Sequence, residues 1–241
     1  MPDMMLLMIC YPTWKMNELT KNNFLYFSPP ERIVEMAKEI RPEETSRESA
    51  FYLWMKAPNP MVTLFKKIDV TNLVSVIKKK HLKFNMLRDY CIGKAASKIE
   101  EFYILPVGDK LIQYDSIAVN TIIKNKNGEV NSCDLLFSED IEVFNKEYLA
   151  YTAEASDNSS DRDLSADHMV IGTSAIVETE IKGAVNIYSG FNNPFIVWGR
   201  YSKKLFRYQM MLSFQFHHTQ MDGAHAGRFL QNLQDEISAL K

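Results

Sequence analysis

The C-terminal segment constrains the fold most, because two periodicities meet inside it. In RYQMMLSFQFHH, which ends at His218, alternate positions such as Phe214 and Phe216 are apolar, and this predicts a strand with a buried face. From about Gly223 to Leu240 the apolar residues recur at helical spacing, which predicts an amphipathic helix. The chain therefore has to pack a terminal helix against a sheet.

Two neighbouring histidines close this predicted strand. Alternation puts His218 on the face of Phe216 and puts His217 on the opposite, polar face. A desolvated imidazole stays neutral and can accept a proton, so His218 is the candidate general base. A core histidine bonded to backbone remains an alternative. A metal site built on both rings is disfavoured, because adjacent strand side chains point apart. Asp222 can cap the following helix or brace the site against a cation.

The rest of the chain mixes helices and strands before a mostly antiparallel β section. Apolar residues on one face predict a short helix over 29–40, and Thr45 or Ser46 can cap the next helix. Helical periodicity also predicts a helix starting at 71 and helices over 85–99 and 138–155, the last of which Ser138 can cap. Strand periodicity predicts strands over 4–10, 61–70, 101–107, 110–124, 168–177, 182–188 and 194–201. Residues 156–167 are polar and aspartate-rich, which predicts an exposed loop. This loop lacks the glycine and glutamate of a calcium loop, so we expect no metal.

Composition limits the classes of partner. The 241 residues are enough for one large domain or two small ones. A net charge of −2 gives no basic excess for nucleic acid or an anionic membrane. The three cysteines are far apart, which disfavours a disulfide framework and fits a reducing compartment, so we expect a cytoplasmic protein. The apolar stretch over 4–10 is too short to span a bilayer.

The segment HHTQMDGAHAGRFLQNLQDEI resembles the active-site segment of the chloramphenicol acetyltransferase family. Its HHxxxDG pattern is also shared with dihydrolipoamide acyltransferases. Four further stretches resemble the family in the same order: RESAF, FKKIDVTNL, IGTSAIV and PFIVWGRY. The resemblance covers roughly residues 45–240. We therefore expect an N-terminal extension with a short helix over 1–45 and a chloramphenicol acetyltransferase-like domain over 46–241.

The resemblance implies a fold and an assembly. The fold would be α/β (α+β), a two-layer sandwich of a mixed, largely antiparallel sheet with helices. The assembly would be a homotrimer with each active site between subunits. The activity would be transfer of an acetyl group from acetyl-CoA to a hydroxyl of a small acceptor, with both substrates bound together.

The resemblance also assigns roles to residues. His218 would take the proton from the acceptor hydroxyl, and Ser174 would donate a hydrogen bond to the tetrahedral oxyanion. Asp222 would be structural and pair with an arginine, for which Arg47 is the best candidate, although a surface ion pair is equally open. The coenzyme would lie near the pair formed by Arg200 and Tyr201.

Two positions and one segment depart from the family pattern. Val197 stands where a threonine that holds water near the oxyanion is usual, and Gly172 stands where an asparagine is common. The segment after Ser174 carries Glu178 and Glu180 in place of residues that line the pocket of the antibiotic-resistance enzymes. We therefore expect an O-acetyltransferase whose acceptor is chloramphenicol or another hydroxylated compound. The alternative is a weak or inactive relative that binds a small ligand.

Overall fold

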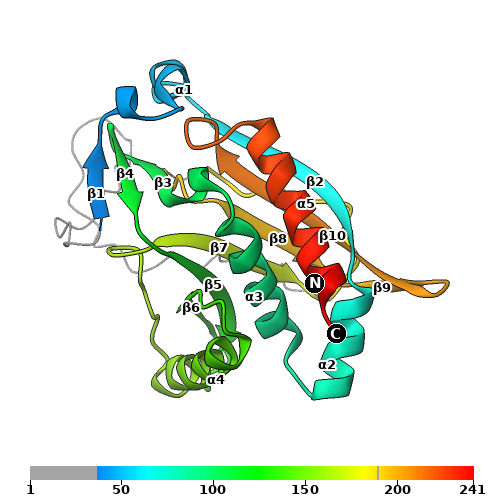
Figure 1. Ribbon diagram of the computed structural model, residues 1–241. Helices are drawn as coiled ribbons and strands as arrows, with labels where there is room; N and C mark the ends of the chain where they lie inside the picture. Colours follow the sequence, from blue (N-terminus) through cyan, green and yellow to red (C-terminus); the bar gives the residue numbers. More distant parts are fainter. Residues whose placement is uncertain (1–36, 189) are drawn as a thin grey trace, which may run out of the picture.

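The chain folds into a mixed β-sheet with helices against one face (Figure 1). The computed structural model describes residues 37–188 and 190–241. The strands are β1 (Ala37–Ile40), β2 (Met61–Asp69), β3 (Ile104–Val107), β4 (Lys110–Tyr114), β5 (Ile117–Lys124), β6 (Val130–Leu136), β7 (Met169–Ile176), β8 (Phe195–Gly199), β9 (Ser202–Lys204) and β10 (Arg207–His217). The helices are α1 (Glu48–Trp54), α2 (Thr71–Lys80), α3 (Phe84–Ala96), α4 (Ile141–Asn158) and α5 (Gly223–Ala239), with short 3-10 turns at Pro42–Glu44 and Glu100–Tyr103.

The main sheet has seven strands in the order β2-β10-β8-β7-β5-β6, with β9 paired to β10. The pairs β5–β7 and β7–β8 are parallel, and the other pairs are antiparallel. A separate three-stranded sheet has the order β1-β4-β3. This mixed, largely antiparallel arrangement confirms the fold class expected from the sequence.

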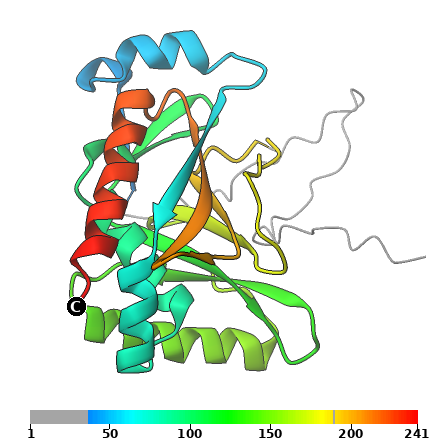
Figure 2. The ribbon, with the colours of Figure 1, turned by 90° about the vertical axis from the view of Figure 1, so that its right-hand side faces the viewer.

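The helices and the strands form two layers. Figure 2, which views the sheet edge-on, places α5 and α2 on one side and the segment between β7 and β8 on the other. Phe214 of β10 lies 4.6 Å, centroid to centroid, from Phe229 of α5, and both rings are fully buried. Because α5 presents one apolar face and β10 alternates, burial of these two surfaces against each other stabilises the pairing.

Four predictions about single elements are wrong. Residues 37–40 form β1, in which Ile40 pairs with Leu111, so backbone pairing outweighs the helical spacing of the apolar residues. Residues 182–188 form no strand in the described structure. Asp140, not Ser138, caps α4 by accepting from the amides of Glu142 and Val143. That helix also runs on to residue 158, so the loop predicted over 156–167 begins later.

Some predictions fall on residues that the structure does not describe. The strand over 4–10 and the first part of the helix over 29–40 lie outside the described residues. Within the described part of the chain, no helix is both long and apolar enough to cross a bilayer.

Candidate active site

His218 follows the last residue of β10 and lies at the end of the sheet where α1 crosses (Figure 1). Its amide donates to the carbonyl of Pro60 at 2.9 Å. Its imidazole stacks on the indole of Trp54 in α1, with ring centroids 4.5 Å apart and planes 7° apart. Among the described residues, Nδ1 of His218 is buried without a hydrogen-bond partner. The ring is therefore held by stacking on Trp54.

Arg47 fixes the turn that carries His218. Its Nη2 donates to the carbonyl of His218 at 2.9 Å, and its Nε donates to the carbonyl of Thr219 at 3.0 Å. Its Nη1 lies 3.3 Å from Oδ2 of Asp222. The Arg47 side chain is 6% exposed, whereas Asp222 is 40% exposed. The guanidinium thus holds both ends of one turn, and its bond to the Thr219 carbonyl is buried while its bond to the His218 carbonyl is partly buried.

Asp222 has a second function at the start of α5. Its Oδ1 accepts from the amides of Ala224 and His225, and the ring of His225 accepts from the amide of Asp222. Nε2 of His225 also lies 3.0 Å from Oε1 of Glu101. The backbone bonds at the helix start and Arg47 lower the pKa of Asp222, against the opposing effect of burial.

The predicted contrast between the two histidines is reversed. His217 is 2% exposed and its Nδ1 accepts from the amide of Thr219, whereas His218 is only half-buried. Burial, with a smaller contribution from His218, lowers the pKa of His217 to about 4. The alternation pattern predicted the wrong histidine as buried because it assumed that the polar face of β10 is exposed to solvent. Residues 184 and 186 bond to Ser213 and Gln215 and cover that face of β10.

Ser174 lies on β7 in a row of side chains that crosses the sheet. It pairs with Val197 of β8, which pairs in turn with Ser213 of β10. Ser213 lies five positions before His218 along the chain. At ~3.3 Å per residue along a strand and ~4.8 Å between strands, Ser174 and His218 of one chain lie roughly 20 Å apart. The structure does not bring these two predicted site residues together within a single chain.

Gly172 makes room for an aromatic side chain. A Cβ atom at this position would lie 2.3 Å from Cδ2 of Phe195, its strand neighbour on β8. The glycine and the phenylalanine are therefore complementary, which explains the absence of asparagine. Both residues line a cavity of about 80 Å³ on the sheet face opposite the helices. Asn120, Asp134 and Gln215 contribute polar groups to the same cavity.

Arg200 and Tyr201 lie at the other end of β8. The Nε of Arg200 donates to the carbonyl of Val177 at 2.9 Å, and its side chain is exposed. Tyr201 stacks on Phe84 and meets Tyr208 edge-on, with centroids 5.1 and 5.7 Å away. The ammonium of Lys78 lies 5.3 Å from the centre of the Tyr208 ring. The structure thus places Tyr201 in an aromatic cluster with a lysine beside it.

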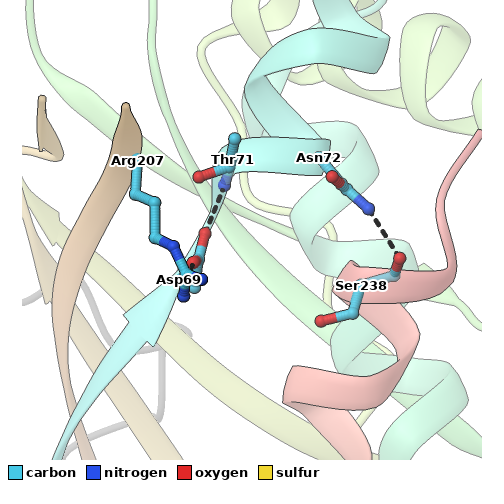
Figure 3. Close-up of a pocket in the computed structure, with 5 residues that line it drawn as sticks. All are labelled: Asp69, Thr71, Asn72, Arg207 and Ser238. Atoms are coloured by element: carbon cyan, nitrogen blue, oxygen red, sulfur yellow. Dashed lines mark hydrogen bonds and ion pairs between the residues drawn. The ribbon is translucent and has the colours of Figure 1, made fainter. Parts of the chain in front are cut away.

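A second hollow lies at the opposite end of β2 from the histidine turn and has a volume of about 290 Å³ (Figure 3). Its carboxylate, Asp69, accepts from the amide of Thr71 and pairs with Arg207 at 3.3 Å. Asn72 spans to the carbonyl of Ser238 at the end of α5. These groups are already engaged in joining α2 to α5 and β10. We found no cluster of three or more metal-ligating side chains within residues 37–188 and 190–241.

Sequence reasoning did not identify Trp54. Its place beside His218 comes from the packing of α1 across the end of the sheet, and no local pattern in the sequence signals it.

Comparisons with known proteins identify relatives of this chain. The model of the chloramphenicol acetyltransferase family matches residues 38–234. Chloramphenicol acetyltransferase 3 of Escherichia coli is 26% identical over 181 residues, covering 72% of this chain and 84% of that protein. The chloramphenicol acetyltransferase of Bacillus pumilus is 26% identical over 204 residues, covering 83% and 92%.

Solved structures share the fold. A chloramphenicol acetyltransferase superposes with a TM-score of 0.74 at 22% identity, covering 86% of this chain and 100% of that chain. A probable dihydrolipoamide acetyltransferase from Listeria monocytogenes superposes with a TM-score of 0.61 at 15% identity, covering 85% and 95%.

Proposed function

Because the chain belongs to the chloramphenicol acetyltransferase family, whose members transfer acetyl groups from acetyl-CoA, we propose that it acetylates a hydroxyl of a small acceptor with His218 as general base. The observation that carries this proposal is the double restraint on His218. Trp54 stacks on its ring, and Arg47 binds its carbonyl. A half-buried imidazole with a fixed orientation suits proton abstraction.

In the proposed reaction both substrates bind together. Nε2 of His218 accepts the acceptor's hydroxyl proton as the oxygen attacks the thioester carbonyl. The tetrahedral intermediate then collapses, the C–S bond breaks, and the thiolate of coenzyme A leaves and takes up the proton. Ser174 would donate a hydrogen bond to the intermediate's oxyanion, a contribution typically worth about 3 kcal/mol.

The separation of His218 from Ser174 supports active sites between subunits, as in the homotrimer that the family resemblance implies. Since roughly 20 Å divides the two residues in one chain, direct transfer requires Ser174 from another copy. The sheet face that bears Ser174 also bears the exposed Phe65 of β2, and the segment between β7 and β8, on the same side, exposes Val185 and Ile187. Such a surface is typical of subunit contacts.

The aromatic cluster of Tyr201, Phe84 and Tyr208 is the proposed coenzyme region. Flat rings can receive the adenine by stacking. Lys78 beside Tyr208 and the exposed Arg200 offer cations for phosphates. We place the activity in the cytoplasm, because Cys91 and Cys133 are buried free thiols, which suits a reducing compartment.

Release of free coenzyme A thiol from acetyl-CoA, dependent on an added hydroxyl compound, tests the proposal. The panel of hydroxyl compounds should include chloramphenicol. Acetylation of chloramphenicol would support a role in antibiotic resistance. We expect His218→Ala to lose a hundredfold or more of the activity, as is typical for loss of a general base. Wild-type turnover in that variant would disprove the role of His218.

The second candidate is a weak or inactive relative that binds a small ligand. Val197 favours it, since valine offers no hydroxyl near the oxyanion. Acceptor binding by calorimetry without any thiol release would support this candidate.

A further inference from the structure

The cavity on the sheet face opposite the helices is lined on one side by polar residues of β5 and β6, which include the carboxylate Asp134. Asn120 of β5 pairs with Asp134 of β6, and both side chains line the cavity, as does Ser132. Gly172, two residues before Ser174 on β7, lines the same cavity. These polar residues and Ser174, the proposed oxyanion donor, therefore lie on the same side of the sheet.

Asp134 is a buried carboxylate that forms no ion pair within the described residues, although, against the larger effect of burial, the charge of the nearby Arg162 lowers its pKa slightly. It is 3% exposed, and its two oxygens accept from the side chain of Asn120 at 2.6 Å and from the amide of Leu164 at 2.9 Å. No lysine or arginine in the described ranges forms an ion pair with it. Arg162 donates instead to the backbone carbonyl of Asp134 and stacks on Tyr151 at 3.9 Å.

A buried carboxylate without an ion-pair partner is costly in a low-dielectric site, and a ligand cation would offset that cost. Burial raises the pKa of Asp134 to about 6, so the group is mainly ionised at neutral pH. Asp134 has acceptor capacity left for a ligand donor, because a carboxylate can accept about four hydrogen bonds. A neutral acceptor could donate hydrogen bonds to this carboxylate but would bring no compensating positive charge.

We propose that the acceptor is a hydroxylated amine, whose ammonium group binds at Asp134 while its hydroxyl is acetylated. This inference rests on the proposed acetyl transfer and names the substrate class of that site. Asp134 lies about two strands across and two residues along from Ser174, a separation of roughly 12 Å by strand geometry. An amine and a hydroxyl about six carbons apart match that separation.

The alternative role for Asp134 is structural. Its bond to the amide of Leu164 helps to dock the loop after α4, and a purely structural carboxylate would affect all acceptors equally. Asp161 provides a matched control, because it is also an aspartate that accepts from β6. It binds the amide of Ser132 and the side chain of Asn131, and it does not line the cavity.

The experiment compares 6-amino-1-hexanol with 1,6-hexanediol as acceptors for the full chain with acetyl-CoA. Ester products are identified by mass spectrometry. We expect kcat/KM for the amino alcohol to exceed that for the diol by about tenfold or more, as a charge-assisted hydrogen bond allows. Asp134→Asn should bring the ratio close to one, and Asp161→Asn should keep the wild-type ratio. Equal values for both acceptors in the wild type, or an unchanged ratio in Asp134→Asn, would overturn the inference.

Binding of hexylamine and of 1-hexanol, measured by calorimetry, separates this inference from the proposed function. Neither measurement depends on turnover or on the folding of a variant. If no compound is acetylated but hexylamine binds at least about tenfold more tightly than hexanol, the proposed function fails while the amine site stands. If hexylamine binds no better than hexanol, the amine site is wrong even where acetylation occurs.

Discussion

The indole of Trp54 lies parallel to the imidazole of His218, with centroids 4.5 Å apart and planes 7° apart. The contact joins the last residue of α1 to the turn after β10. Because Nδ1 of His218 has no hydrogen-bond partner among the described residues, stacking is the restraint that orients the ring. Trp54 is thus a positioning residue in the proposed site.

Loss of the indole should loosen the imidazole. We expect Trp54→Ala to lower kcat by about ten- to a hundredfold through misorientation of the base, with a smaller change in KM for acetyl-CoA. Trp54→Phe retains a stacking face and should keep most of the activity. Steady-state kinetics on both variants check this. Equal losses in the two variants would show that the ring does not act by stacking.

Arg47 should matter more for stability than Asp222 does. Arg47→Met leaves the carbonyls of His218 and Thr219 without a donor in a buried place and should cost about 3 kcal/mol of unfolding free energy. Asp222→Asn should cost about 1 kcal/mol or less, since Asp222 is 40% exposed and asparagine can still cap α5.

Urea denaturation of the two single variants and the double variant measures these costs. A coupling energy close to the whole cost of Arg47→Met would contradict the view that Arg47 acts chiefly through the two carbonyls.

Local sequence patterns predict the helix and the strand that carry the site, but they do not predict all of the tertiary contacts of these elements. Helical spacing and the Asp222 cap predicted α5, and alternation predicted β10, because both signals come from neighbouring residues. The segment 37–40 was predicted wrongly as a helix, since its partner Leu111 is remote in sequence. Trp54 was missed for the same reason. Such tertiary pairings leave no periodic signal.

The charge of His217 should make stability depend on pH. Burial keeps its pKa near 4 in the folded chain, below its ordinary value of 6.5. Unfolded chains therefore bind a proton first as the pH falls, so stability is complete above about 6.5 and declines towards pH 4, by up to about 3 kcal/mol. His217→Asn should remove this component. Denaturation curves at pH 7.5 and 4.5 measure it, and an identical pH dependence in both proteins would refute it.

Gly172 and Phe195 should behave as a coupled pair. Gly172→Asn alone would force a side chain into the Phe195 ring and should destabilise the fold by about 1–3 kcal/mol. Adding Phe195→Ala should relieve part of that cost, because the ring that blocks Cβ is gone. Thermal unfolding of both single variants and the double variant gives the coupling. Strictly additive effects would mean that the clash relaxes elsewhere.

Val197 is the position where a small change should improve the proposed chemistry. It pairs with both Ser174 and Ser213, and it is 7% exposed. Val197→Thr has nearly the same shape and adds a hydroxyl beside the proposed oxyanion donor. We expect kcat to rise about threefold or more, since a preorganised donor stabilises developing charge, at a cost of about 1 kcal/mol of stability for burying a polar group.

Val197→Ala is the control for this change, because it alters the packing around Ser174 without adding a hydrogen-bonding group. A gain in Val197→Thr that Val197→Ala lacks would mean that the valine limits the chemical step, and would favour the enzyme over the ligand-binding relative. If both variants lose activity alike, the residue contributes only packing, and the oxyanion is stabilised without any group at this position.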